Sequence, residues 1–557
     1  MVVWLVCSLL LPLRIQPIIT SGFGEFRILR FHAGIDFSTH KRIGLPVYAP
    51  TDGVVYRVKA SYYGYGKALY LMSRDSLIFV FAHLDRFNPS IERYVYKLQK
   101  AHRRYYLDIY PDTEFIINKG DLIGYTGESG AGGPHLHFEI RKTEFNPINP
   151  YFLYEFVDTI PPCISEIRVL DYHTGRIYDV WSRNQSGSPT LRASSPFVIE
   201  AVCYDPTEFG YKNPPYKIEL YCDDKLAFLA IHDTLDYRKQ LGSGVYYENC
   251  AHLYGEKLIR LANPIGIDIP VVKKAPKWYN LPEGIHDFKL SVEDYYGNAD
   301  TVMFKLHVTP TIPVHYPDEW QIFNDMKLSF TYFGTYVSGK LHIEGTNLTQ
   351  LDDTTYFFHG EGKWYINTPH SQLTTYGFII PPEGRKLQLQ RVTLIVPKGT
   401  LVHRVNIFAI ITSDTVAVYP KYVPIYRKPY IAGVTHPKEG IFVYERGWHF
   451  IAPDTGRVVT LGKFSILKDT VPPRFEFVTT TRDKIVIHVT DNLSGINGDN
   501  IAFYLDGGWE PIFYDYDNQL LIYRPLEPLT MGYHTYRLVL TDNLDNVLDT
   551  TGTVYFK

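Results

Sequence analysis

Short apolar runs separated by turn residues dominate the first third of the chain. Between residues 22 and 150 they read PVYAPTDGVVYRV, GYGKALYLM, LIFVFAHL, GDLIGYTG and HLHFEI. Such runs, bounded by Gly, Pro and Asp, are typical of β-strands, whose successive side chains point to opposite faces. The pattern predicts a glycine-rich antiparallel β-sheet domain.

One segment of this region has helical spacing instead. Ile91, Tyr94, Val95 and Leu98 recur every three or four residues, after a capping candidate at Asn88. The spacing predicts an inserted helix. Its other face is basic, which a solvated surface explains as well as a contact with substrate does; the basic residues are Arg93, Lys97, Lys100, Arg103 and Arg104.

A repeat appears after residue 154. Asp158-Thr-Ile-Pro-Pro returns as Asp469-Thr-Val-Pro-Pro, and LPEGIHDFKLSVEDYYGN (281–298) aligns without gaps to LTMGYHTYRLVLTDNLDN (529–546). Alternating residues followed by an Asp/Asn-rich turn predict an antiparallel hairpin in a β-sandwich. The two units resemble immunoglobulin-like or fibronectin-like modules of bacterial surface and periplasmic enzymes. His286 and His534 are equivalent in the repeat and lack nearby His or Cys partners, so we interpret them as structural.

These patterns divide the chain into five segments. We expect a signal-like apolar segment (1–20), the glycine-rich β domain (21–157), an Ig-like β-sandwich with an insertion (158–310), a β-rich domain of unknown fold (311–468) and a second Ig-like β-sandwich (469–557). The LQLQRVTLIV and HRVNIFAII runs predict strands in the fourth segment. The fold class is therefore mostly β.

Composition agrees with this division and limits the partners. The 557 residues are 45% hydrophobic and 21% charged, with 45 Tyr, which favours strands in several globular domains. A net charge of -3 gives no reason to expect a nucleic-acid partner. The Val2–Leu13 run is shorter than the roughly 20 residues of a transmembrane helix. We interpret it as a secretory signal and expect no transmembrane helix.

Four of the five cysteines fall within one stretch of the chain. Cys163, Cys203, Cys222 and Cys250 could form two disulfides in an oxidising compartment, by any of three pairings, or stay buried free thiols. The sequence leaves these alternatives open.

Four histidines and an aspartate offer metal chemistry. In GPHLHFEIR, His135 and His137 share one face of a strand, and in FHAGIDF His32 and Asp36 are four positions apart, which puts both on one side of an extended segment. His83 ends the run LIFVFAHL. Two His and one carboxylate can hold zinc with a fourth position open for water, as in catalytic sites.

The motifs together resemble a known family. SGFGEFR, FHAGIDF, LPVYAPTDGVV, GYGKALYL, FAHL, INKGDLIGYTGESG and GPHLHFEIR are similar to stretches of the lysostaphin/LytM-type zinc metallopeptidases, which cut peptide cross-links of bacterial peptidoglycan. The resemblance implies that His32, Asp36 and His137 bind one zinc ion and that His83 and His135 are catalytic. This sequence departs from the family in the insertion between Phe87 and Lys119 and in GAGG before Pro134.

The resemblance implies an exported zinc metalloendopeptidase that acts through a zinc-activated water. His135 is expected to be the general base, and His83 to stabilise the oxyanion. Peptidoglycan is the expected substrate, in the periplasm or cell envelope of a Gram-negative-type bacterium. For Asp121, Glu128 and Glu139 we favour surface solvation, although Glu139 shares a strand face with His137 and has the position of an orienting partner.

Two alternatives remain. One is a non-catalytic cell-wall adaptor or regulator of other hydrolases, against which the complete set of five residues argues. The other is an assembly scaffold in which the C-terminal β domains contact other cell-envelope proteins and the enzyme is accessory.

Overall fold

The computed structural model describes residues 9–557 except 28, 174–176, 186–188, 249–257, 312–320, 324–325, 332–333, 352, 402–403, 422, 424 and 426. Strands make up almost all of its regular structure, so the expected mostly β fold is confirmed. The described helices are α1 (Pro89–His102) and α2 (Ser243–Tyr246), with 3₁₀ turns η1 (Pro150–Phe152), η2 (Tyr237–Gly242) and η3 (Gly498–Asn500). Among the described residues, no helix has the length and apolar character needed to cross a membrane.

The first domain is one antiparallel sheet of eleven strands whose main order is β1-β2-β10-β6-β5-β4-β7. Leu136, Phe138 and Ile140 point from the central strand into its hydrophobic core. The strands are β1 (Ile19–Ser21), β2 (Ile35–Ser38), β3 (Pro46–Tyr48), β4 (Gly53–Ala60), β5 (Lys67–Ser73), β6 (Ile78–Phe87), β7 (Leu107–Ile109), β8 (Ile116–Ile117), β9 (Leu122–Thr126), β10 (His135–Thr143) and β11 (Asn146–Ile148).

Helix α1 lies where the spacing predicts a helix. Asn88 caps it by accepting a hydrogen bond from the Ile91 backbone N–H at 3.0 Å, and Ile91 and Val95 join the core of the sheet. The apolar N-terminal segment also packs here, because Leu13 is buried in the same core. Residues 1–8 lie outside the described residues, so the signal-like interpretation of residues 1–20 stays a prediction.

The second part is a sandwich of two sheets around one core. In it, β21 and β22 form the hairpin expected from FKLSVED. Its strands are β12 (Cys163–Asp171), β13 (Ile177–Ser182), β14 (Thr190–Ala193), β15 (Phe197–Pro206), β16 (Lys212–Asn213), β17 (Lys217–Cys222), β18 (Lys225–Ile231), β19 (Leu258–Arg260), β20 (Val272–Lys274), β21 (Gly284–Glu293) and β22 (Ala299–Val308). Cys163, Cys203 and Cys222 are free thiols here, and Cys250 lies outside the described residues.

The third part contains sheets of five, eight and four strands. LQLQRVTLIV forms the β31–β32 hairpin, and HRVNIFAII contains β33. The strands are β23 (Gln321–Phe323), β24 (Met326–Thr331), β25 (Gly334–Ser338), β26 (His342–Gly345), β27 (Leu348–Gln350), β28 (Thr355–Phe358), β29 (Gly362–Asn367), β30 (Gln372–Ile380), β31 (Arg385–Leu389), β32 (Val392–Val396), β33 (Val405–Ile411), β34 (Val416–Tyr419), β35 (Tyr430–Gly433), β36 (Glu439–Tyr444), β37 (Trp448–Ala452), β38 (Thr455–Arg457) and β39 (Lys463–Lys468).

The fourth part is a second sandwich, made of two four-stranded sheets. Its β46–β47 hairpin corresponds to β21–β22. The repeated histidines have corresponding bonds, since His286 Nδ1 lies 2.8 Å from Asp223 and His534 Nδ1 lies 2.6 Å from Asp506. The strands are β40 (Arg474–Thr481), β41 (Lys484–Thr490), β42 (Ala502–Leu505), β43 (Gly508–Glu510), β44 (Phe513–Asp515), β45 (Leu520–Tyr523), β46 (Gly532–Thr541) and β47 (Val547–Phe556).

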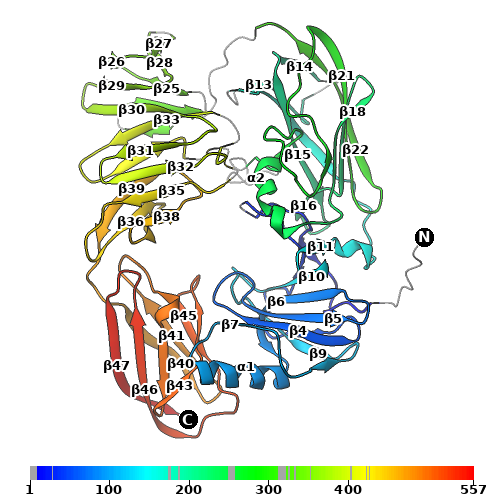
Figure 1. Ribbon diagram of the computed structural model, residues 1–557, viewed down its shortest axis with the longest axis vertical. Coiled ribbons are helices and arrows are strands. Elements are labelled where there is room, and N and C mark those ends of the chain that lie inside the picture. The colour runs from blue at the N-terminus through cyan, green and yellow to red at the C-terminus, as the bar shows by residue number, and fades with distance from the viewer. Residues whose placement is uncertain are drawn as a thin grey trace.

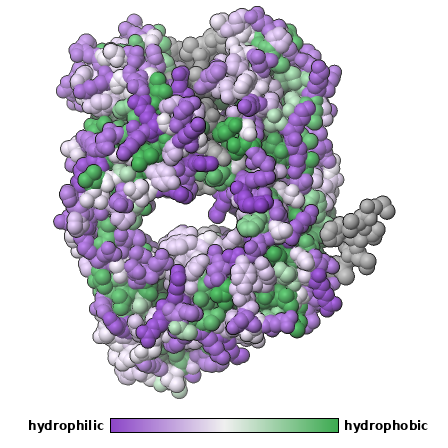
Figure 2. Space-filling model, viewed as in Figure 1, coloured by the Kyte–Doolittle hydropathy of each residue, from purple (hydrophilic) through white to green (hydrophobic). Residues whose placement is uncertain are grey.

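The four parts form a closed ring in which the last part contacts the first (Figure 1). Figure 2 shows an opening through the middle of the molecule. The contact is apolar and charged: Tyr62 and Tyr105 of the first domain lie in the core of the fourth part, and Lys100 of α1 bonds Glu510 at 2.6 Å. The basic face of α1 thus supplies an interdomain ion pair.

We predict that Tyr62→Ala weakens ring closure. The Tyr62 ring is 6% exposed and stacks on Tyr105 with centroids 4.7 Å apart, so its loss should cost about 3 kcal/mol. Differential scanning calorimetry should show a lower Tm for the transition that involves the fourth part. Tyr533→Ala, at a ring 79% exposed in the same part, is the control, and equal Tm values for the two variants would contradict the prediction.

Candidate metal centre

The site is assembled by the central strand of the first sheet. Strand β10 lies between β2 and β6, and its register places His137 opposite Asp36 on one side and opposite Ala82 on the other. The side chains of β10 alternate strictly. Leu136 and Phe138 enter the apolar core, while His135, His137 and Glu139 share the other face.

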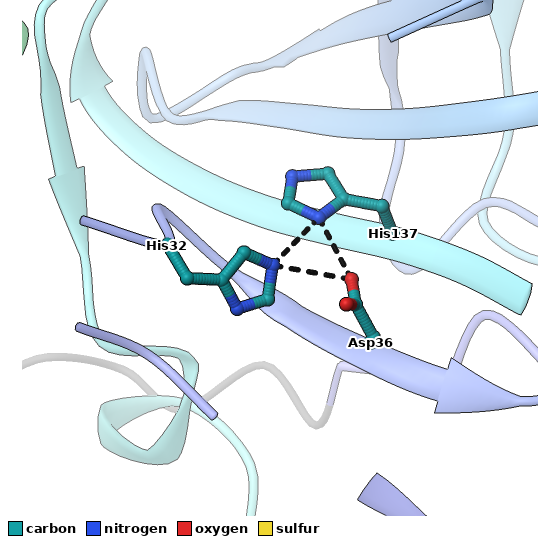
Figure 3. A group of neighbouring side chains, drawn as sticks. All are labelled: His32, Asp36 and His137. Atoms are coloured by element: carbon teal, nitrogen blue, oxygen red, sulfur yellow. Dashed lines mark hydrogen bonds and ion pairs between the residues drawn. The ribbon is translucent and has the colours of Figure 1, made fainter. Parts of the chain in front are cut away.

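Three side chains converge on one point (Figure 3). His32 Nε2 lies 2.9 Å from His137 Nδ1 and 3.1 Å from Asp36 Oδ1, and His137 Nδ1 lies 2.9 Å from the same oxygen. All three residues are buried, at 5 or 6% exposure. The other Asp36 oxygen accepts a hydrogen bond from Arg27 at 2.9 Å, which leaves Oδ1 directed at the imidazoles.

The hydrogen bonds of the two imidazoles determine which nitrogen is available. His32 Nδ1 lies 2.8 Å from the Gly22 carbonyl oxygen, which can only accept, so Nδ1 carries the proton and Nε2 is free to bind. His137 Nε2 lies 2.7 Å from Glu139 Oε1 and donates to it, which leaves Nδ1 for the centre. Both free nitrogens are those that face Asp36.

The pKa shifts of Asp36 and His137 agree with this arrangement. Burial alone would raise the pKa of Asp36, but His32 and His137 outweigh burial and hold that pKa well below its usual value. Burial would lower the pKa of His137, yet bonds to Asp36 and Glu139 raise it to about 9. That proton must leave when a metal binds.

Glu139 is the residue whose role the sequence interpretation missed. Surface solvation is wrong, because Glu139 has 0% exposure and bonds His137, Arg141 and Tyr65. Tyr237, from the second part of the chain, donates to its other oxygen at 2.9 Å. A buried carboxylate behind a ligand histidine fixes the ring and increases its basicity. The even spacing of His135, His137, Glu139 and Arg141 was the available signal.

Of the other two acids, Asp121 is exposed and Glu128 is half-buried.

His83 and His135 lie beside the three converging side chains. Their ring centroids are 4.6 Å apart, and the His83 centroid is 5.7 Å from that of His137. His83 has a backbone φ of 60° at a bulge where β5 and β6 change register, and this left-handed conformation turns its side chain toward β10. His83 Nδ1 lies 2.9 Å from the Ser129 carbonyl and His135 Nδ1 lies 3.0 Å from that of Gly133, so each Nε2 is an acceptor.

The fourth part of the chain borders the glycine-rich loop of the site. A Cβ on Gly132 would lie 3.8 Å from Asp517 Oδ2, and Arg524 donates to Asp85 at 2.9 Å. Burial first, then Asp515 and Asp85, raises the pKa of Glu128 in the same loop. The surroundings of the site thus come from both ends of the chain.

The donor set fits a catalytic zinc ion. Two ligands about 2 Å from a tetrahedral zinc lie roughly 3.3 Å apart. The three donor atoms here lie 2.9–3.1 Å from one another, a few tenths of an ångström closer. Two imidazoles and one carboxylate leave one coordination position for water.

Residues 30–100 match the model of peptidase family M23. The chain carries an M23 peptidase domain. The match takes in His32, Asp36 and His83 and ends inside α1, before His135 and His137. The resemblance to LytM-type peptidases is therefore confirmed, while the roles of the five residues stay predictions.

Three relatives each match about a quarter of this chain. A protein of Haemophilus influenzae described as an uncharacterized metalloprotease is 31% identical over 148 residues, 25% of this chain and 26% of that protein. This chain thus spans about a quarter of that relative's length. The catalytic domain of the M23 protein EnpA from Enterococcus faecalis is 26% identical, with 24% of this chain and 89% of that chain covered and a TM-score of 0.18. A zinc-containing peptidase from Vibrio cholerae is 25% identical, with 27% and 40% covered and a TM-score of 0.20.

We predict that Glu139→Gln weakens zinc binding by about 10–100-fold without removing a ligand, because the amide is a poorer acceptor for His137 Nε2. Competition with a chromogenic chelator measures the affinity. Glu114→Gln, at an exposed carboxylate of the same domain, should bind zinc as the wild type does. Equal affinity in the Glu139 and Glu114 variants would show that Glu139 does not act on the ligand.

Proposed function

We propose that the M23 domain is an exported zinc metalloendopeptidase that hydrolyses peptide cross-links of bacterial peptidoglycan. The proposal is carried by the convergence of His32, Asp36 and His137 beside two further histidines. According to the proposal, these three residues bind one zinc ion. The M23 match and the metalloprotease relative support peptide hydrolysis.

A bound zinc ion supplies Lewis acidity, which makes a water molecule nucleophilic near neutral pH and polarises the scissile carbonyl. The chain supplies the rest. Glu139 holds His137 in the tautomer that presents Nδ1, and the Gly22 carbonyl holds His32 in the one that presents Nε2. Arg27 donates a hydrogen bond to the second carboxylate oxygen of Asp36. The three side chains are therefore oriented for binding in the absence of metal.

His135 is the general base of the proposal. Its Nδ1–H donates a hydrogen bond to the Gly133 carbonyl, and its Nε2 lies 3.7 Å from Asp36 Oδ1 and is free to accept a proton. Burial lowers the pKa of His135, so the ring is neutral and able to accept a proton at neutral pH.

The role of His83 in the proposal depends on the protonation of its ring. Burial lowers the pKa of His83 to about 3, and its Nδ1–H donates a hydrogen bond to the Ser129 carbonyl. A neutral His83 therefore presents an acceptor, and it can donate to an oxyanion or a leaving amine only after taking up a proton at Nε2. In the proposal that proton is the one that His135 removes from the nucleophilic water, and His83 passes it from Nε2 to the leaving amine.

The proposal also includes a substrate and a cellular location. The chain acts on peptidoglycan in a Gram-negative-type periplasm or cell envelope, where the cross-link between D-alanine and diaminopimelate is the target. The C-terminal β parts position the enzyme and offer surface to other envelope proteins. The non-catalytic adaptor is less well supported, because all five side chains are present and lie together.

We predict that His137→Ala loses zinc and activity, whereas His135→Ala keeps zinc and loses about 10²–10⁴ in rate. The two variants and the wild type are incubated with purified sacculi, and released muropeptides and bound zinc are measured. His102→Ala, at an exposed position of α1, should match the wild type.

The outcomes separate the alternatives. Equal muropeptide release by wild type and both site variants would refute the enzyme. Binding of the wild type to sacculi without release would support the adaptor. An equal fall of zinc content in both variants would show that His135 is a ligand and not the base.

A further inference from the structure

Each Ig-like part contains a cluster of three aspartates that lies apart from the M23 site. The first cluster is Asp158, Asp205 and Asp294, and the second is Asp469, Asp491 and Asp542. In each, one carboxylate oxygen from every member lies within 4.8 Å of the others.

The two clusters occupy equivalent places in the repeat. Asp158 and Asp469 open the two Asp-Thr-x-Pro-Pro segments, and Asp294 and Asp542 directly follow the aligned hairpin strands β21 and β46. Asp205 lies in β15 and Asp491 follows β41, and these two strands pair with the first strand after each Asp-Thr-x-Pro-Pro segment. The whole cluster has therefore been repeated.

The same backbone and amide bonds orient both clusters. Asn298 Nδ2 donates to Asp294 Oδ2 at 2.6 Å and to the Asp158 carbonyl at 3.2 Å. Asn546 Nδ2 donates to Asp542 Oδ2 and the Asp469 carbonyl at the same two distances. Two different sequences thus hold one arrangement of carboxylates.

The clusters concentrate negative charge without a counter-ion. Asp294 and Asp469 are 1% exposed and Asp542 is fully buried. Across the described residues, none of the six carboxylates forms an ion pair with Lys or Arg. Burial, and then Asp158 and Asp294, raises the pKa of Asp205 to about 8. Such a group of like charges is costly unless a cation joins it.

Unpartnered oxygens point to that cation. Asp205 Oδ1 and Asp491 Oδ1 are buried and accept no hydrogen bond within the described part of the chain. Asn213 stands opposite Asp205 across the β15–β16 pair, is 5% exposed, and also has an Oδ1 without a partner. Asn213 lines one small cavity together with Asp158, Asp205 and Asp294. The cavity therefore collects three carboxylates and a spare amide oxygen.

We propose that each three-aspartate cluster binds one calcium ion. The donors are all oxygens, which suits a hard cation and disfavours zinc, whose protein ligands are mainly nitrogen and sulfur. Calcium takes six to eight oxygens in flexible geometry, whereas magnesium demands a near-octahedral shell and keeps its waters. Three carboxylates in each cluster, joined in the first by the Asn213 amide oxygen, fit the first description.

The ions would lie at two junctions of the ring. The cavity of the first cluster is also lined by Phe23, Asn149 and Tyr151 of the first domain. At the second cluster, the Asp469 N–H donates to the Lys438 carbonyl, and Lys438 Nζ donates to the Leu544 carbonyl at 2.9 Å. Calcium would therefore stiffen the connection before each sandwich.

The test measures calcium on the full, zinc-loaded chain after removal of calcium with a chelator. Equilibrium dialysis with elemental analysis should give two calcium ions per wild-type chain, with half-saturation at about 10⁻³ M or below. Asp205→Asn and Asp491→Asn should each retain one ion, and the double variant none. The controls Asp224→Asn and Asp483→Asn, at exposed turn positions of the same two parts, should retain two.

Thermal unfolding gives a readout that does not depend on the stoichiometry. Calcium should raise the Tm of the wild type, and the double variant should lose this rise while its Tm without calcium stays equal or increases, because buried charge has been removed. No bound calcium and no Tm rise at about 10 mM calcium would overturn the proposal. Equal binding of magnesium alone would overturn the choice of calcium, and two ions retained by the double variant would overturn the choice of residues.

Discussion

The pairing of β10 between β2 and β6 is the constraint on which the site depends. This register brings His137 within 2.9 Å of His32, a residue 105 positions away, and sets Asp36 directly opposite. A shift of one residue would turn the polar face of β10 into the apolar core and place Leu136 and Phe138 at the centre. The hydrophobic core and the candidate metal centre are therefore specified by the same hydrogen-bond ladder.

The polar face of β10 needs support from outside its own sheet. Glu139 and Arg141 are both buried, and a buried ion pair persists only when its remaining donors and acceptors are satisfied. Tyr65 supplies one bond from the first domain, and Tyr237 supplies another from the second part of the chain. Glu139 in turn orients His137. The second part of the chain thus contacts the polar face of β10, beside the candidate metal centre, through the Tyr237 hydroxyl group.

The ring closes this assembly from the other side. The fourth part takes Tyr62 and Tyr105 into its core. Its Asp517 lies near Gly132 of the glycine-rich loop, and its Arg524 bonds Asp85 of β6, two residues after His83. The opening seen in Figure 2 is bounded by these four connected parts. Hence the parts that follow the M23 domain are more than extensions of it, because two of them contribute to its surroundings.

Local patterns in the sequence predicted the elements well and the contacts between them poorly. The hairpins β21–β22 and β46–β47 and helix α1 follow from period and capping, which are properties of neighbouring residues. The shared face of His135 and His137 follows from the two-residue period of a strand. The sequence did not predict the contacts of Tyr237 and Tyr62 or the left-handed backbone of His83. Each of these depends on packing between segments far apart in the chain. Glu139 lies two positions after His137, so the sequence places both on the same strand face. This spacing alone cannot distinguish a face exposed to solvent from one that another domain covers.

X-ray absorption at the zinc edge of the full, zinc-loaded chain tests the central claim most directly. The account predicts four ligands at about 2.0–2.2 Å, of which two are imidazoles and the others are oxygens from a carboxylate and a water. Two imidazoles retained in His135→Ala, with no bound zinc left in His137→Ala, would agree with it. Three or four imidazoles, or a sulfur ligand near 2.3 Å, would contradict it.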